Sequence, residues 1–158
     1  MQLSELTIRP LTQAEAESIA GWRYPGEYSF YDHDADPGDR DELLHHRGDQ
    51  YFAALTPSGE LVGFLQFKPA DDAVEIGLGL RPDLTGRGLG GEFLAQGLAF
   101  AKQHYGVNRI TLAVAAFNQR AIRVYERAGF VETGCAPRET GGATWEFVTM
   151  ALELPSPG

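Results

Sequence analysis

The sequence contains very little cysteine, with Cys135 as the one cysteine among 158 residues. A single cysteine excludes a disulfide within the chain and a zinc site built from several cysteines. Cys135 lies in a strand-like stretch, so we expect it to be a small core residue, as free cysteines commonly are. The alternative, a catalytic thiol, lacks a histidine nearby in the sequence to act as its partner.

Long apolar runs and an excess of basic residues are also missing. No stretch of about 18 apolar residues is present, so we expect no membrane span. Residues Met1–Pro10 do not combine a basic segment with an apolar one, so we expect no signal peptide and a cytoplasmic location. The 13 basic and 22 acidic residues give a net charge of -9, which argues against a nucleic-acid partner. This charge is compatible with a cationic acceptor, although solubility alone is the commoner reason for an acidic composition.

No internal repeat, low-complexity block or linker rich in Pro, Gly and Ser divides the chain. A chain of this length can bury one core of its own. We therefore expect a single domain over residues 1–154, followed by a loose tail at residues 155–158.

The hydrophobic pattern predicts strands and helices in alternation. Strands are expected at Leu6–Pro10, Tyr51–Leu55, Leu61–Phe67, Ala73–Leu80, Arg109–Ala115, Phe130–Cys135 and Thr144–Leu152. Helices are expected at Gln13–Ala20 behind a Thr12–Glu15 capping box, at Asp41–His46, at Gly90–His104 and after Asn118. Consecutive early strands indicate an antiparallel half, and the strand–helix–strand unit at 73–115 indicates a parallel pair. The expected fold is an α/β mixed sheet with helices on both faces.

The most informative segment is a glycine loop, Thr85–Gly91, between a predicted strand and a predicted helix. Its four glycines let backbone amides close around an anion, because no Cβ is in the way. The following helix adds free N–H groups and the positive end of its dipole. Arg87 can add a charge-assisted contact. We interpret the loop as a phosphate or pyrophosphate site, since a merely tight turn needs only one or two glycines.

Two common phosphate motifs fit this loop poorly. The Walker pattern needs Gly-Lys followed by Ser or Thr, which is absent. Gly86–Gly91 does satisfy G-x-G-x-x-G, the dinucleotide fingerprint. That fingerprint also needs an acidic residue about 20 residues further on to hold the ribose. No Asp or Glu lies between Glu92 and Glu126, which argues against a nicotinamide-dependent oxidoreductase.

Two segments resemble motifs of the GNAT (Gcn5-related) N-acetyltransferases. Residues Thr85–Gly90 are similar to the family's Gln/Arg-x-x-Gly-x-Gly/Ala turn, with Thr85 where the family usually has Gln or Arg. Residues Asn118–Phe130 are similar to its Asn-x-x-Ala-x-x-x-Tyr-x-x-x-Gly-Phe segment. The resemblance implies a GNAT-like acyl-CoA N-acyltransferase fold, acetyl-CoA as cosubstrate and no metal.

The resemblance also assigns the cofactor contacts. It implies that the pyrophosphate lies on the amides of Gly86–Gly91 and that the pantetheine arm runs beside Leu78–Leu80. A β-bulge at Gly79 is expected to separate this strand from the next one, and a free amide at Leu78–Leu80 to bind the thioester oxygen. The residues expected to bind the cofactor are Leu78, Gly79, Leu80, Thr85, Gly86, Arg87, Gly88, Leu89, Gly90, Gly91 and Asn118. Asn118 can also cap the helix that follows it.

In the resembling family an amine attacks the thioester directly in a ternary complex, which requires a base and an acid. Tyr125 matches the family's tyrosine and is the expected acid; the alternative is a core tyrosine at helical spacing. Glu75 is the expected base, because Ala113 stands where some relatives carry a glutamate. The alternatives for Glu75 are a solvent-facing carboxylate or a water chain in its place.

The expected function is therefore N-acetyltransfer to a primary amine, on a small molecule or a protein N-terminus. The alternative is a non-catalytic acyl-CoA-binding regulatory module, and a homodimer is compatible with the family. The acidic, aromatic stretch Trp22–Asp41 lies where relatives shape the acceptor site. Its rings and acids either cradle a cation or form a packed loop. Residues Asp32–Asp36 begin like a calcium loop, but Pro37 and Leu43 replace the required Gly and Glu.

Overall fold

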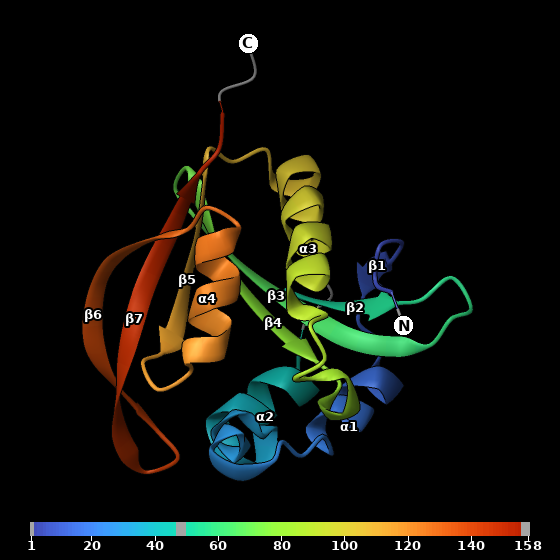
Figure 1. Ribbon diagram of the computed structural model, residues 1–158. Coiled ribbons are helices and arrows are strands. Elements are labelled where there is room, and N and C mark those ends of the chain that lie inside the picture. The colour runs from blue at the N-terminus through green and yellow to red at the C-terminus, as the bar shows by residue number, and fades with distance from the viewer. Residues whose placement is uncertain (1, 47–49, 156–158) are drawn as a thin grey trace.

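The computed structural model describes residues 2–46 and 50–155, and the strands of these residues form one sheet (Figure 1). The strands are β1 (Thr7–Pro10), β2 (Tyr51–Leu55), β3 (Leu61–Ala70), β4 (Ala73–Leu80), β5 (Arg109–Ala115), β6 (Val131–Thr140) and β7 (Ala143–Glu153). Their order is β1-β2-β3-β4-β5-β7-β6, with β4 and β5 parallel and all other neighbours antiparallel. This is the mixed sheet that the sequence predicts. Residues 156–158 of the predicted tail lie outside the described residues.

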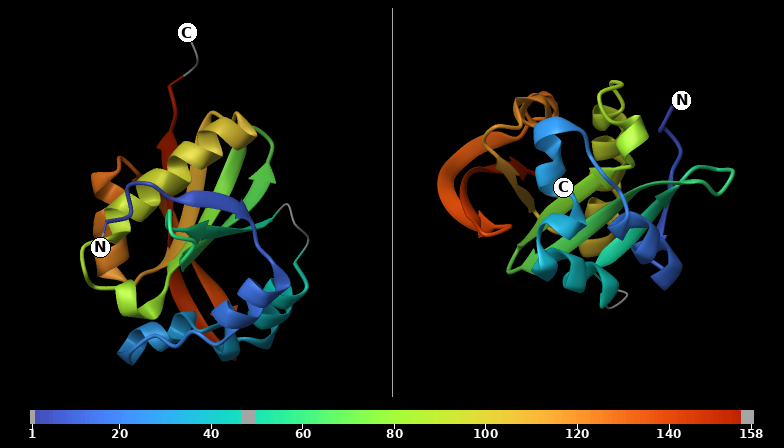
Figure 2. Two further views of the ribbon diagram at one scale, coloured as in Figure 1. Left: turned by 90° about the vertical axis from the view of Figure 1, so that its right-hand side faces the viewer. Right: turned by 90° about the horizontal axis from the view of Figure 1, so that it is seen from below.

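Helices lie on both faces of this sheet (Figures 1 and 2). The α-helices are α1 (Gln13–Ala20), α2 (Pro37–Leu44), α3 (Gly90–Tyr105) and α4 (Gln119–Arg127), and the short 3₁₀ helices are η1 (Gly26–Tyr31), η2 (His33–Ala35) and η3 (Pro82–Leu84). The helices α3 and α4 lie side by side on one face, and α1 and α2 cover the other (Figure 2). Within the described ranges, no helix is both long enough and apolar enough to cross a bilayer.

The two faces of β2 explain this arrangement. Phe52 and Ala54 pack in the larger core under α3, whereas Tyr51, Ala53 and Leu55 pack in a second core under α1 and α2. Every residue of β2 is therefore buried, as expected for a strand with helices on both sides.

Local capping sets where two of the helices begin. Thr12 and Glu15 form the predicted capping box at the start of α1. The start of α2 differs from the expected helix at Asp41–His46, because Asp36 accepts hydrogen bonds from the amides of Gly38 and Asp39. Pro37 then occupies the first helical position, where its fixed φ favours a helix and its missing N–H costs nothing.

The prediction that Cys135 packs in the core is wrong. Cys135 is exposed on β6, the outermost strand of the sheet. Strand β6 pairs with β7 on one side only, and most of its side chains are exposed. Its sequence pattern does not reveal an edge position, because an edge is a property of the whole sheet.

The parallel strands β4 and β5 separate soon after they meet. Their pairing covers only Ala73–Glu75 opposite Arg109–Thr111. The expected bulge at Gly79 is absent, since the β3–β4 register passes through Phe64 and Gly79 without a shift. A different cause explains why position 79 is a glycine. A Cβ at this position would overlap the Phe64 ring.

Candidate active site

The gap between β4 and β5 opens into a cleft of about 780 Å³. Strand β4, the glycine loop, α4 and the aromatic segment around η1 provide its walls. The predicted site residues that line it are Leu78, Gly79, Leu80, Thr85, Gly86, Gly88, Leu89, Gly90, Gly91, Asn118 and Tyr125. Two other predicted residues, Glu75 and Arg87, lie outside this lining. The fold therefore brings most of the predicted site together around one cavity.

Main-chain groups of β4 face this cleft without a partner strand. The amide of Arg81 donates to the carbonyl of Val62 on β3 at 2.9 Å, which fixes the direction of the alternating main-chain groups. The N–H and C=O groups of Leu78 and Leu80 consequently point toward β5, beyond the last β4–β5 pair. The carbonyl of Leu80 accepts a hydrogen bond of 2.7 Å from the Tyr24 hydroxyl.

The glycine loop presents its backbone to the same cleft. Gly86 and Gly88 adopt positive φ angles of 69° and 76°, which favour glycine. A Cβ at Gly88 or Gly91 would meet no heavy atom within 4 Å, so the space above the loop is open. No side chain caps α3. The amides of its first turn therefore lack partners within the helix, and this arrangement fits a phosphate group.

Side-chain hydrogen bonds stabilise the segment that leads into the glycine loop. Arg81 donates to Asp83 at 2.6 Å and to Glu60 at 2.8 Å, and both bonds raise the pKa of this guanidinium. The hydroxyl of Thr85 donates to the carbonyl of Pro82 at 2.7 Å. Arg87 donates to the carbonyl of Asp83 at 3.4 Å and does not line the cleft. The expected contact of Arg87 with a phosphate stays a prediction.

Arg120, in the first turn of α4, is a residue that the sequence interpretation missed. It lines the cleft, and its Nη1 atom lies 3.2 Å from the place that a Cβ on Gly86 would occupy. Its guanidinium also lies 4.3 Å from the centroid of the Tyr28 ring, a cation–π distance. The sequence held a signal for this contact. Asn118 predicts the start of a helix, so Arg120, two residues later, is expected in the first turn of that helix, close to Asn118.

Tyr125 of α4 lines the cleft, near Tyr31. Burial, with a smaller contribution from the neighbouring Tyr31, raises the pKa of the Tyr125 phenol, so the group keeps its proton at neutral pH. The side-chain oxygen of Asn118 accepts from the Ala121 amide at 3.1 Å, which confirms its capping role. Its amide nitrogen donates to the Tyr31 hydroxyl at 3.1 Å. A contact of Asn118 with the cofactor stays a prediction.

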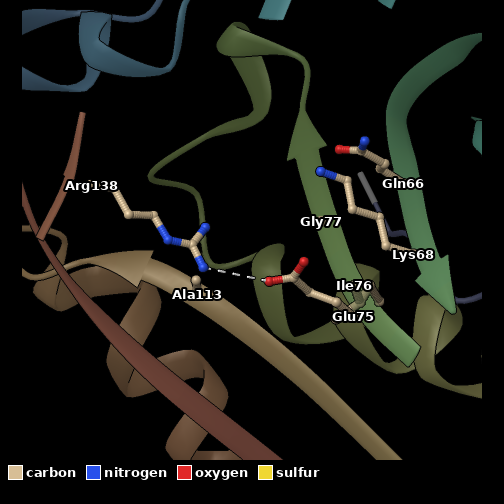
Figure 3. Close-up of a pocket in the computed structure, with 7 residues that line it drawn as sticks. All are labelled: Gln66, Lys68, Glu75, Ile76, Gly77, Ala113 and Arg138. Carbon is tan, nitrogen blue, oxygen red and sulfur yellow. Dashed lines mark ion pairs between the residues drawn. The ribbon is translucent and has the colours of Figure 1, made fainter. Parts of the chain in front are cut away.

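Glu75 lies in a smaller cavity of about 160 Å³ that shares its other walls with the main cleft (Figure 3). The lining residues of this base cavity are Gln66, Lys68, Glu75, Ile76, Gly77, Ala113 and Arg138. The Glu75 carboxylate lies 3.9 Å from the Arg138 guanidinium. Ala113 of β5 lines the same space, and Glu75 supplies the carboxylate among these lining residues.

The aromatic segment packs largely against the protein itself. Asp32 accepts from the Tyr24 amide at 2.8 Å, and Asp36 caps α2. Phe30 packs against Trp145 with ring centroids 4.8 Å apart. Trp145, on β7, is 38% exposed. These contacts favour the packed-loop interpretation over the cation cradle.

Comparisons with known proteins found a family match and several relatives. A family model described as the acetyltransferase (GNAT) family matches residues 14–130. A mycothiol acetyltransferase of Salinispora tropica is 35% identical over 86 residues, which are 51% of this chain and 28% of that protein. One of Propionibacterium freudenreichii is 39% identical over 94 residues, covering 53% of this chain and 30% of that protein. The matches thus span less than a third of these curated relatives.

Solved structures share the fold across almost the whole chain. A GNAT-family acetyltransferase from Bacillus anthracis has a TM-score of 0.73 at 19% identity, covering 97% of each chain. The spermidine N-acetyltransferase of Vibrio cholerae, in complex with CoA and spermine, has a TM-score of 0.73 at 20% identity. That match covers 95% of this chain and 96% of the other. At such identities the likeness concerns the fold alone.

Proposed function

This chain belongs to the acetyltransferase (GNAT) family, and from that premise we propose that it transfers an acetyl group from acetyl-CoA to a primary amine. One observation carries the proposal. The unpaired main chain of β4, the uncapped start of α3 and the Tyr125 phenol all face one cleft. These are the groups needed to bind a thioester arm, a diphosphate and a leaving thiolate.

Acetyl-CoA would occupy the cleft along its length. The pyrophosphate would accept hydrogen bonds from the amides of Gly86–Gly91, with Arg120 adding a positive charge. The amide groups of the pantetheine arm would pair with Leu78 and Leu80, in place of the strand that β5 no longer provides. Binding of CoA by the Vibrio cholerae enzyme supports this use of the shared fold.

The reaction itself would be a direct transfer. The amine nitrogen attacks the thioester carbonyl carbon, and the main-chain N–H of Leu78 stabilises the oxygen as it becomes anionic. The carbon–sulfur bond then breaks, and the Tyr125 phenol donates its proton to the leaving thiolate. Glu75, directly or through water, takes the proton that the amine loses. The products are an N-acetyl amine and free CoA.

A second candidate keeps the cofactor site without turnover, as a module that binds acyl-CoA and regulates a partner. The test mixes the purified chain with acetyl-CoA and a panel of primary amines and follows release of free thiol. We expect thiol release that depends on the amine. Heat of CoA binding in calorimetry without such release would favour the regulatory module. The absence of any binding heat at high protein concentration would overturn both candidates.

A further inference from the structure

Two cations reach the base cavity from opposite walls (Figure 3). Lys68 comes from β3 and Arg138 from β6, with Glu75 of β4 between them. The nearest carboxylate oxygens are 3.7 Å from Lys68, on Glu42, and 3.9 Å from Arg138, on Glu75. Both separations are too long for a hydrogen bond. Among the residues that the structure describes, neither cation donates a hydrogen bond, so their donors are available to a ligand.

The fold holds these two cations in defined positions. Lys68 lies directly opposite Glu75 in the β3–β4 register, so the two side chains share one face of the sheet. The Arg138 guanidinium lies 5.3 Å from the centroid of the Phe147 ring on β7. The tip of the β6–β7 hairpin is tied to α2, because Asp36 accepts from the Thr140 hydroxyl at 3.2 Å and the Gly141 amide at 3.0 Å.

The charge balance of the base cavity indicates what it accepts. Its walls carry the cations Lys68 and Arg138 and the carboxylate of Glu75. Glu42 adds a second carboxylate next to the cavity, 3.7 Å from Lys68, and accepts a hydrogen bond of 2.7 Å from the Gln66 amide. Cations and carboxylates are thus equal in number here, and a ligand that carries only positive charge would add an unbalanced charge beside Lys68 and Arg138. A ligand with one amine and one acid group meets a partner for each, and a cavity of about 160 Å³ suits a small molecule.

We infer that the acetyl acceptor is a small amino acid or a close analogue, with its amine beside Glu75 and its acid group held by Lys68 and Arg138. The inference rests on the proposed transferase activity and names the substrate class for the same cleft. The two cations would also favour the neutral, nucleophilic form of the bound amine, because nearby positive charge disfavours a second cation.

The test compares acceptors that differ only in the acid group. The purified chain is given acetyl-CoA and a panel of α-amino acids, and thiol release identifies the best acceptor. Its carboxamide, its decarboxylated amine and spermidine are then measured in the same way. We expect kcat/KM to be at least tenfold higher for the amino acid than for the other three acceptors. Equal or higher values for spermidine or the carboxamide would overturn the inference.

Two variants locate the recognition. Arg138→Gln and Lys68→Gln should each lower kcat/KM for the amino acid at least tenfold, and the loss for the decarboxylated amine should be at least fivefold smaller. Arg109→Gln, which removes a surface ion pair with Glu153 at 2.8 Å, is the matched control. Unchanged CoA affinity in calorimetry verifies that each variant is folded. Equal losses for both acceptors would contradict an acid-binding role.

The proposed activity and the choice of an amino acid as acceptor have separate tests. Turnover of amines regardless of a neighbouring acid group would refute the amino acid inference alone and leave the transferase activity standing. No thiol release with any amine would refute the proposed activity, and the inference with it.

Discussion

Tyr125 and Glu75, the two side chains assigned to proton transfer, lie in contrasting surroundings. The Tyr125 side chain is partly buried, and this burial, with a smaller contribution from Tyr31, raises the pKa of its phenol and keeps it protonated until a stronger base is formed. Glu75 is 37% exposed and borders two cations at the edge of the cleft. A protonated, partly buried phenol and a carboxylate nearer to solvent match the two halves of the proposed proton transfer.

We expect Tyr125→Phe to lower kcat at least tenfold with little change in the Kd of acetyl-CoA. The physical reason is that the ring still fills the cleft wall, whereas the proton donor for the leaving thiolate is lost. Steady-state kinetics and calorimetry measure the two quantities. Tyr28→Phe, which keeps the ring under Arg120, is the control and should retain kcat. Unchanged turnover in Tyr125→Phe would remove the acid role.

Replacement of Glu75 with glutamine should depress activity most at low pH. There the acceptor amine is protonated and a base is limiting, whereas at high pH the free amine is already abundant. The measurement is kcat/KM as a function of pH for the variant and the parent. Glu139→Gln changes a carboxylate elsewhere in the cleft lining and should leave the profile intact. Profiles of identical shape for Glu75→Gln and the parent would exclude this residue as the base.

At the scale of elements, the glycine loop and the start of α3 act together as one anion site. We expect Gly88→Ala to weaken CoA binding at least tenfold, because a methyl group would project into the open space above the loop. The matched control is Gly59→Ala in the β2–β3 turn, which also has a positive φ and open surroundings. Both changes should cost about 1–2 kcal/mol of folding free energy from backbone strain. Equal CoA affinity in the two variants would argue against the loop as the phosphate site.

The start of α2 and the β6–β7 turn are joined by the Asp36 carboxylate. Hydrogen bonds from the amides of Gly141, Gly38 and Asp39 lower the pKa of Asp36 in the folded protein. Its stabilisation is therefore complete above the unfolded pKa of about 3.9 and is lost as the pH falls through the lower folded value.

Accordingly, Asp36→Ala should lower the urea midpoint at pH 7, and its difference from the parent should shrink below pH 4. Asp41→Ala, on an exposed turn of the same helix, is the control and should change the midpoint little. A difference that is constant from pH 7 to pH 3 would mean that the ionised carboxylate does not stabilise this junction.

The whole molecule consists of two antiparallel sets of strands joined by a short parallel contact between β4 and β5. A ligand in the gap would contact both parts of the molecule: β4 belongs to the first set of strands, and α4 connects β5 and β6 of the second set. CoA should therefore stabilise the fold as a unit, by about 2.7 kcal/mol at a concentration of 100 Kd. For a chain of this size that corresponds to a rise in Tm of about 5–10 °C.

Hydrogen exchange with and without CoA locates this effect. We expect slower exchange at the amides of Leu78, Leu80 and Gly86–Gly91 and in the first turn of α4. Tm under the same conditions gives the global value, and Gly88→Ala provides the comparison, with a smaller rise at equal CoA concentration. Protection confined to the far side of the sheet would place the ligand outside this cleft.

Local chemistry made much of this protein predictable from its sequence. Hydrophobic periodicity predicted the strands and most helices. Thr12 and Glu15 predicted the start of α1, and the glycine loop predicted an anion site. Each of these signals acts between residues that are close in the chain. The start of α2 was equally local, in Asp36-Pro37, and was overlooked.

Tertiary structure alone decided the features that depend on distant residues. Cys135 is exposed because β6 became an edge, and Gly79 is required because the Phe64 ring of the neighbouring strand lies over it. Lys68 and Arg138 are 70 positions apart in the chain but line the same cavity. The strand order, with β7 between β5 and β6, brings them there. Sequence spacing carries no record of such contacts, because packing of the whole sheet creates them.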